Sequence, residues 1–326
     1  MRQATLIYNP LAGPANLSAT IELVADFWRA RGWRVAIRAT RAPGHAQQLA
    51  HAAAAAGHAL VLAAGGDGTL GEAANGLVGT DTVLAPLPVG TGNSFGKELR
   101  LPRPGLLARH KLLHAAEALA AGRVQQMDLG YTCPVEGENG RFWLLWTGIG
   151  VDAILVDEME PRPKLLKRIG APGYALQALT QVPKLHFMHA TVTIDGQDYS
   201  GDYVLILISN CRLYGGGEIL LSPQAHLDDG LFEVWLLQGD SVLDTFVHLA
   251  NLLRGQHVAR DAAQRVNGRH VYVQTKPTMP CQTDGDRAGH TPLRVEIRPR
   301  AVRMLIPDTA PSDLFSLPGT PLSSVR

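Results

Sequence analysis

A cluster of glycines around one aspartate is the stretch of this chain best suited to chemistry. Gly65-Gly66-Asp67-Gly68-Thr69 follows the short apolar run Leu60–Ala64, which predicts a buried strand. An alanine-rich segment with Glu72 near its start comes next and favours a helix. Glycines permit positive φ and close backbone approach, and a helix N-terminus presents free N–H groups to an anion. The order strand, glycine turn, helix therefore predicts a phosphate-binding loop.

The residues around the glycines decide between the known kinds of phosphate loop. Gly66–Gly71 matches the G-x-G-x-x-G pattern of dinucleotide-binding folds, which also need an acid about 20 residues later for the ribose. The next predicted strand ends in Val89-Gly90-Thr91-Gly92 without an acid, and Asp67 would repel a pyrophosphate. Gly92–Glu98 fails as a Walker loop because it has one spacer residue too few and ends in Glu98 instead of Ser or Thr. A purely structural turn is the remaining simple alternative.

The first half of the chain must position this loop. Apolar periodicity and turn residues predict alternating strands and helices joined by short links. The predicted strands are 4–8, 33–39, 60–64 and 81–89, and the predicted helices are 18–31, 45–56, the alanine-rich segment after Gly68, and 106–121. This alternation predicts an α/β domain with a parallel sheet.

Three turns follow strands of this predicted sheet, at Asn9–Gly13, Gly65–Thr69 and Gly90–Asn93. In open parallel sheets, ligands bind at the carboxyl ends of the strands. We therefore expect these turns to lie together and to form one site.

The pattern changes near Met127, after which the chain is mostly predicted antiparallel β-structure. The predicted strands are 141–147, 190–194, 203–209, 231–237, 271–275 and 293–297, with helices near 156–179 and 241–253. We place a first domain at residues 1–127 and a β-rich domain at 128–301. The segment from about 302 to 326 either returns to the first domain or is disordered, because it is rich in Pro and Ser.

Composition narrows the class of protein. A formal net charge of +1 over 326 residues provides no basic field for nucleic acid. Cys133, Cys211 and Cys281 are far apart, which suits buried thiols in a reducing cytoplasm. No signal peptide is apparent, and the apolar runs are too short to span a bilayer. We expect a cytoplasmic protein whose membrane contact, if any, is peripheral at the inner face.

The motifs together resemble one family, in its order and over nearly the whole chain. They are Asn9–Gly13, Thr40 with Gly44, Gly65–Thr69 with Glu72, Pro88–Phe95, Met127–Gly130, Gly148–Asp152, Tyr214–Glu218, Pro223 with Leu227–Phe232, and Thr283–Asp286. This set is similar to the diacylglycerol kinase catalytic domain family, which includes bacterial lipid kinases and is related to sphingosine and ceramide kinases. The resemblance implies the nucleotide-binding fold of NAD kinases and phosphofructokinases.

The resemblance also implies roles for individual residues. Asp284 and Asp286 match the acidic pair that supplies the catalytic base, Asp67 the acid beside the β- and γ-phosphates, and Asp128 a further member of the acidic network. ATP would be bound by Asn9, Pro10, Leu11, Ala12, Gly13, Thr40, Gly65, Gly66, Asp67, Gly68, Thr69, Leu70, Gly71 and Thr91. Asp-Gly is also a common hairpin turn, which is the structural alternative for Asp284.

A structural Mg²⁺ site is implied by the same resemblance at Leu227–Leu231. Asp229 would bind the ion by its side chain, and His226 and Leu231 would bind through the backbone. Carboxylate and carbonyl oxygens suit such a hard cation. A simple hairpin turn is the alternative.

Two positions depart from the family pattern. Ser94 stands where many bacterial members carry Asp, and Asp286 replaces the usual Glu, which shortens the side chain by one methylene. Because of Ser94, the sequence predicts the substrate less narrowly than it predicts the kinase activity.

We therefore predict a lipid kinase that uses ATP and Mg²⁺ to phosphorylate the hydroxyl of a lipid such as diacylglycerol. Sphingoid bases, ceramide or a soluble alcohol are alternative acceptors, and a nucleotide-binding regulator without turnover is the alternative of another class. The expected partner is a lipid at a membrane surface, and a homodimer is left open. The basic stretch Pro161–Arg168 would attract anionic headgroups, or it is a solvated helix face.

Overall fold

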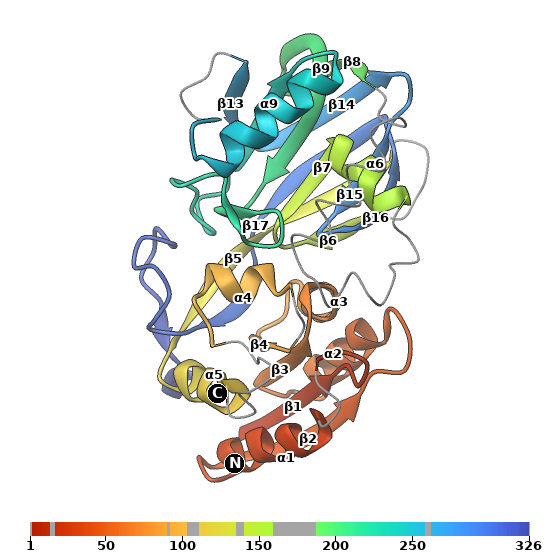
Figure 1. Cartoon of the computed structure of the whole chain (residues 1–326). Coiled ribbons are helices and arrows are strands. Elements are labelled where there is room, and N and C mark those ends of the chain that lie inside the picture. Colours follow the sequence, from red (N-terminus) through yellow and green to blue (C-terminus); the bar gives the residue numbers. More distant parts are fainter. Residues whose placement is uncertain are drawn as a thin grey trace. The chain divides into compact units, whose positions relative to one another are not determined.

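The computed structural model describes residues 2–13, 17–89, 92–102, 111–134, 140–158, 187–257 and 262–325. These residues form two compact units (Figure 1). Unit 1 contains Met1–Asp128, His226–Asp229 and Pro299–Arg326, and unit 2 contains Leu129–Ala225 and Gly230–Arg298. Unit 1 is the α/β domain that the alternating pattern predicts.

Unit 1 is built on a parallel sheet. Its strand order is β2-β1-β3-β4, continued by the C-terminal part of β17, which pairs with β4 at Arg303 and Met304. The strands are β1 Arg2–Tyr8, β2 Trp33–Ala39, β3 Leu60–Gly65, β4 Val83–Pro88 and β17 Leu293–Ile306. Every residue of β3 and β4 is buried, because helices cover both faces of a central parallel strand.

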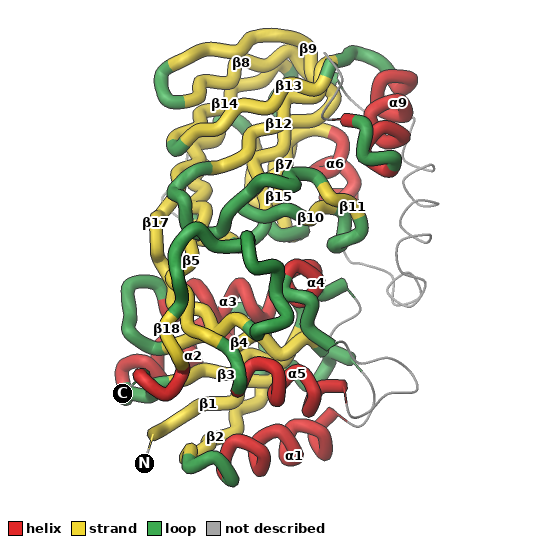
Figure 2. The backbone as a smooth tube through the Cα atoms, turned by 90° about the vertical axis from the view of Figure 1, so that its left-hand side faces the viewer, coloured by secondary structure: helices red, strands yellow, loops and turns green. Residues whose placement is uncertain are grey.

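Helices pack in pairs against this sheet. Figure 2 shows α1 with α5 on one side and α2 with α3 on the other, and each pair is in contact. The helices are α1 Leu17–Arg29, α2 His45–Ala55, α3 Asp67–Leu77, α4 Ser94–Glu98 and α5 Lys111–Ala120. In α1, Ile21, Val24, Ala25 and Trp28 are buried, which is the helical stripe that its sequence contains.

The C-terminal segment belongs to unit 1 and is tied to it by hydrogen bonds. Both carboxylate oxygens of Asp228 accept backbone amides, from Ser316 at 2.6 Å and Leu317 at 2.9 Å. Leu314 is fully buried. The short strand β18 Thr320–Pro321 pairs with the start of β5 Arg123–Pro134. In the structure, this segment is therefore part of unit 1.

Unit 2 is mostly antiparallel β-structure around one apolar core. Its strand order is β16-β15-β7-β9-β8-β14-β17, and β12 joins β9 to β13. The strands and helices are β6 Arg141–Trp143, β7 Trp146–Gly150, α6 Val151–Glu158, β8 Met188–Ile194, β9 Gln197–Ser209, β10 Leu213–Tyr214, β11 Ile219–Leu220, β12 Phe232–Gln238, α9 Val242–Leu253, β13 Ala263–Gly268, β14 His270–Lys276, β15 Pro280–Thr283 and β16 Asp286–His290. In the core, the Trp143 and Phe232 rings stack with centroids 5.3 Å apart.

The structure corrects one predicted strand and describes only parts of two predicted helices. Residues 141–147 comprise β6 and the start of β7, because a bend at Leu144 and Leu145 separates the two strands. The helix predicted from 156 corresponds to α6, which ends at Glu158. The rest of that helix, the basic stretch 161–168 and the start of the helix predicted at 106 lie outside the described residues. Among the helices that the structure describes, none is long and apolar enough to cross a membrane.

Candidate functional site

The predicted phosphate loop forms the junction of β3 and α3. Gly66 precedes the first helical residue, Asp67, in extended conformation, and no side chain caps the helix from this position. A Cβ on Gly65 would lie 2.4 Å from Thr69 Cβ, so packing requires a glycine there. A Cβ on Gly66 or Gly68 would meet nothing within 4 Å. The backbone is therefore uncovered where α3 begins, as an anion-binding helix N-terminus requires.

The carboxylate of Asp67 turns away from its own helix and binds the next loop. Its Oδ2 accepts the Ser94 amide at 2.8 Å and its Oδ1 accepts the Phe95 amide at 3.1 Å. Burial raises the pKa of Asp67, and these amides together with the Ser94 hydroxyl oppose that rise. Asp67 thus caps α4, and the two amides that it accepts stabilise its ionised carboxylate.

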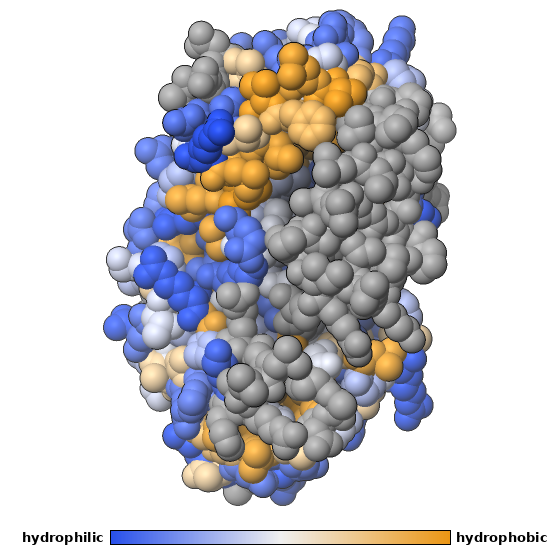
Figure 3. Space-filling view, viewed as in Figure 1, coloured by the Kyte–Doolittle hydropathy of each residue, from blue (hydrophilic) through white to orange (hydrophobic). Residues whose placement is uncertain are grey.

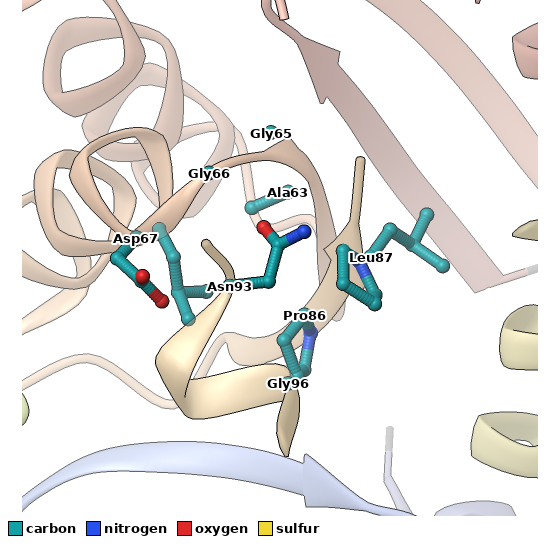
Figure 4. A pocket seen from close by; sticks show the side chains of 10 residues that line it. Ala63, Gly65, Gly66, Asp67, Pro86, Leu87, Asn93 and Gly96 are labelled. Carbon is teal, nitrogen blue, oxygen red and sulfur yellow. The ribbon is translucent and has the colours of Figure 1, made fainter. Parts of the chain in front are cut away.

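A small pocket lies between the two loops (Figure 4). Its volume is about 10 Å³, which is room for about one water molecule. Gly65, Gly66, Asp67, Asn93 and Gly96 line it together with residues of β4. The pocket shows that the loops after β3 and β4 adjoin each other.

The turn after β1 lies at the same edge of the sheet. The Asn9 amide donates to Ala64 O at 3.0 Å, and the Asn9 side chain accepts the Leu11 amide at 2.9 Å. Gly13 has φ +74°, and a Cβ there would lie 2.4 Å from Val89 Cγ1. The Thr40 amide donates to Tyr8 O at 2.9 Å. The structure therefore brings together the turns after β1, β2, β3 and β4, with Pro10 and Ala12 in the first turn, whereas Thr91 lies outside the described residues.

Glu72, the second acid of the glycine motif, also caps another helix. Its Oε2 accepts the Ala46 amide at 3.0 Å, at the start of α2. Gly44, the N-cap of α2, has φ +79° and no side chain with which to cap it. The motif's remaining residues, Leu70 and Gly71, are buried in α3. Both motif acids therefore hold neighbouring elements in place.

Asp284 and Gly285 form the two-residue turn between β15 and β16. Their φ values of +51° and +84° fit a type I′ hairpin. The Asp284 carboxylate accepts the amides of Leu144 at 2.8 Å, Leu145 at 2.8 Å and Trp146 at 3.2 Å. Burial raises the pKa of Asp284 to about 6 even though these amides stabilise the carboxylate. Asp284 therefore holds the turn that divides β6 from β7, and its pKa suits proton transfer near neutral pH.

The other two acids of the predicted network lie in different surroundings. Asp286 Oδ2 lies 3.3 Å from Arg141 Nη2, in a half-exposed ion pair within unit 2. Asp128 is fully buried in unit 1, and its Oδ1 accepts the Arg300 amide at 2.6 Å. Asp128 thus anchors the segment that returns to unit 1.

The predicted metal loop is divided between the units. His226 and Asp229 belong to unit 1, and Leu231 belongs to unit 2. Asp229 Oδ2 lies 3.9 Å from His226 Nδ1. The described residues contain no group of three or more His, Cys, Asp or Glu side chains that could hold a metal ion. Mg²⁺ binding by the backbone at His226 and Leu231 and the side chain of Asp229 stays a prediction.

A buried polar cluster in unit 2 has no assigned role in the sequence prediction. Asp152 Oδ2 accepts Gln282 Nε2 at 2.8 Å and the Tyr214 hydroxyl at 3.3 Å. Within the described ranges, Asp152 Oδ1 is buried without a hydrogen-bond partner. Burial raises the pKa of Asp152 to about 6. Asp152 and Tyr214 belong to motifs that the sequence contains, but spacing alone does not show that they meet.

A larger groove of about 680 Å³ lies on unit 2, and no predicted site residue lines it. It is lined by side chains of β5, β14 and β17, among them Tyr131, Tyr272 and Arg294. Strand alternation directs these side chains to the face opposite the core.

Comparison with known proteins identifies the family. Residues 3–132 match the model of the diacylglycerol kinase catalytic domain, and residues 147–306 match the YegS C-terminal NAD kinase beta sandwich-like domain. A Pseudomonas putida protein named "Probable lipid kinase YegS-like" is 31% identical over 324 residues, which cover 98% of this chain and 99% of that protein. A Bacillus subtilis diacylglycerol kinase is 28% identical over 295 residues, covering 90% and 92% of the two chains.

A solved structure shares the fold. The crystal structure of a diacylglycerol kinase from Bacillus anthracis str. Sterne has a TM-score of 0.68 and 20% sequence identity, and the match covers 95% of this chain and 98% of that one. The α/β first domain with its parallel sheet and the mostly antiparallel β second domain are thereby confirmed. With its glycine turn, its motif acids and its two matched domains, this chain belongs to the diacylglycerol kinase catalytic domain family of lipid kinases.

Proposed function

We propose that this protein transfers the γ-phosphate of ATP to the hydroxyl of a lipid, and that diacylglycerol is that lipid. The observation that carries the proposal is the uncapped start of α3, where Gly66 and Gly68 leave the backbone open. Free N–H groups at a helix N-terminus stabilise phosphate charge. The Bacillus subtilis relative is named diacylglycerol kinase, which supports this acceptor.

Residues of unit 1 would bind the nucleotide. The loop at Gly65–Gly71 leaves the backbone open at the start of α3. The turn at Asn9–Gly13, whose Asn9, Leu11 and Ala12 amides are bonded within unit 1, lies at the same edge, as does Thr40 after β2. Mg²⁺ bound with the nucleotide would supply the positive charge that phosphoryl transfer requires. Asp67 is the carboxylate of this loop, and we propose that it orients the ion through water.

Asp284 is the proposed base. Phosphoryl transfer needs a residue that accepts the proton of the attacking hydroxyl. Among the described residues, Asp284 Oδ2 accepts one amide, that of Leu144, so a further lone pair is available. The proton of the lipid hydroxyl would pass to this carboxylate as the new oxygen–phosphorus bond forms and the bond to ADP breaks. Asp286 would act beside it as the second member of the pair.

A nucleotide-binding regulator without turnover is the second candidate. The three amides that Asp284 accepts favour it, because they give this carboxylate a structural task that needs no catalysis. Turnover measurements separate the two candidates.

The test is transfer of label from γ-labelled ATP, with Mg²⁺, to diacylglycerol, ceramide or sphingosine in mixed micelles. We expect labelled phosphatidic acid, and a loss of at least about 100-fold in Asp284→Asn. Asp67→Ala should also lose turnover. Asp195→Asn is the matched control, because Asp195 has φ +47°, precedes a glycine in a hairpin and accepts the Arg269 and His270 amides.

Unchanged transfer in both Asp67→Ala and Asp284→Asn would refute the proposal. ATP binding without transfer to any lipid would favour the regulator, and transfer to ceramide or sphingosine alone would replace the acceptor.

A further inference from the structure

Helix α9 of unit 2 has its apolar residues on the outside. The described residues include nine exposed large apolar side chains, and five of them lie on this one helix: Leu243, Phe246, Val247, Leu249 and Leu253. A sixth, Leu220, lies on β11, which α9 contacts. We call these six residues the α9 patch. Figure 3 shows hydrophobic residues gathered over α9 on the viewed face.

The inner side of α9 is largely polar. Its buried residues are His248, Asn251 and Leu252, and His248 Nε2 lies 2.7 Å from Gln238 O. A surface helix of a folded domain usually packs its apolar stripe inward and exposes its polar residues. In α9 this order is reversed, so the helix exposes an apolar surface that can bind a partner outside unit 2.

The charges of α9 fit a lipid bilayer. Asp244 is the acidic residue of the helix, and its carboxylate accepts the Ser241 hydroxyl at 2.6 Å and the Asp240 amide at 3.2 Å. It is therefore engaged in the helix cap. Arg254, the C-cap, is exposed at the end of the helix that also carries Leu253. The acids Asp240 and Asp244 lie at the N-terminal end of α9 and the cation Arg254 at its C-terminal end, and the apolar face between them carries no charge. This arrangement matches the acyl chains of a bilayer, with the C-terminal end at anionic headgroups.

We propose that the α9 patch docks this protein on an anionic bilayer, with its apolar side chains among the lipid acyl chains. The inference rests on the proposed function to the extent that a lipid kinase must reach a substrate held in a bilayer. It goes beyond that function because it assigns the docking surface to α9 and not to the phosphate loops. The surface lies entirely within unit 2.

The experiment replaces the two most exposed leucines of the patch. Leu243 is 70% and Leu253 is 66% exposed, so L243Q/L253Q removes apolar surface while leaving the core unchanged. Leu23→Gln on α1 is the matched control, because Leu23 is a helical leucine that is 51% exposed in unit 1. Thermal unfolding of all variants verifies that each one is folded.

Binding is measured by sedimentation with vesicles of phosphatidylglycerol and phosphatidylcholine. We expect L243Q/L253Q to bind at least about tenfold more weakly, because buried leucine side chains contribute that much or more. Arg254→Gln should lower binding about fivefold, and only when the vesicles are anionic. Leu23→Gln should bind like the unmodified protein.

Turnover separates this inference from the proposed function. We expect L243Q/L253Q to lose activity on diacylglycerol in vesicles but not on a short-chain, water-soluble diacylglycerol. If no acceptor is phosphorylated and vesicle binding still depends on the α9 patch, the docking surface stands and the kinase proposal fails.

Equal vesicle binding by L243Q/L253Q and the unmodified protein overturns the inference. A change from dimer to monomer in analytical ultracentrifugation, with vesicle binding unchanged, also overturns it and assigns α9 to contact between two copies of the chain.

Discussion

The motif acids of this protein act on the backbone of other segments. Asp67 accepts amides at the start of α4, Glu72 at the start of α2, and Asp284 at the turn between β6 and β7. Hydrogen bonds to a carboxylate are stronger than those between neutral groups, and a buried amide left without a partner costs about 1–3 kcal/mol. These residues thus position loops and also supply negative charge. A substitution therefore removes both a backbone contact and a charge, and an activity assay alone does not separate the two effects.

Asp284 gives this protein a predicted pH dependence. Its pKa of about 6 lies above the ordinary value of 3.8, because burial favours the neutral acid. As a base it must be ionised, so kcat/KM on a lipid acceptor should rise with pH and level off above about 6. Stability has the opposite sign: the raised pKa stabilises the fold fully below pH about 4, and this contribution is lost as pH rises through about 6.

The measurement is a pH profile of kcat/KM together with urea unfolding of the unmodified protein and Asp284→Asn. We expect their difference in unfolding free energy to change between pH about 4 and 6 and to be constant above. A kcat/KM that is flat across this range would exclude Asp284 as the base.

At the scale of the element, helices α2 and α4 begin without caps of their own. Asn93, which precedes α4, has φ +47° and makes no side-chain cap, and Gly44 has no side chain. Acids of α3 supply both caps from outside, so α3 fixes where the neighbouring helices begin. The start of α3, with its phosphate loop, is consequently linked to α2 and α4 by direct hydrogen bonds.

Glu72 tests this arrangement. Glu72→Ala should destabilise the protein by about 1 kcal/mol, because the Ala46 amide loses its acceptor. Glu72→Gln keeps a carbonyl oxygen and should cost less. Chemical denaturation of the two variants measures the difference, and equal stabilities would show that water replaces the cap.

Sequence patterns predicted the elements better than their contacts. Buried runs such as Leu60–Ala64 specify their strands locally, and α9 begins and ends within a residue of its predicted range. The break between β6 and β7 was not predicted, because Asp284, which holds it, lies 140 residues from Leu144. The outward apolar face of α9 also could not be predicted, since periodicity gives a stripe but not the side on which the domain packs.

At the scale of the whole molecule, each unit is assembled from separated segments of the chain. Unit 1 takes three segments, and its sheet includes β17, whose first residues pair with β14 in unit 2. Of the site residues, Asp67 belongs to unit 1 and Asp284 to unit 2. The proposed reaction therefore depends on the folding of the complete chain.

The C-terminal segment provides a test of this dependence. Truncation after Pro311 should destabilise unit 1, because it removes buried Leu314 and the amides that Asp228 accepts. Loss of a buried leucine alone costs about 2–5 kcal/mol. Calorimetry should show a lower Tm for the truncated protein. An unchanged Tm would mean that the segment only lies on the surface.

The late position of β17 has a consequence for synthesis. The strand that completes the sheet of unit 1 leaves the ribosome after nearly all of unit 2, although β1–β4 were made first. The phosphate loop thus emerges on a sheet that lacks its last strand, and unit 1 reaches its final fold only after unit 2 has been made. A ribosome that stalls within unit 2 would release an incomplete sheet with an open edge, which is a site for aggregation.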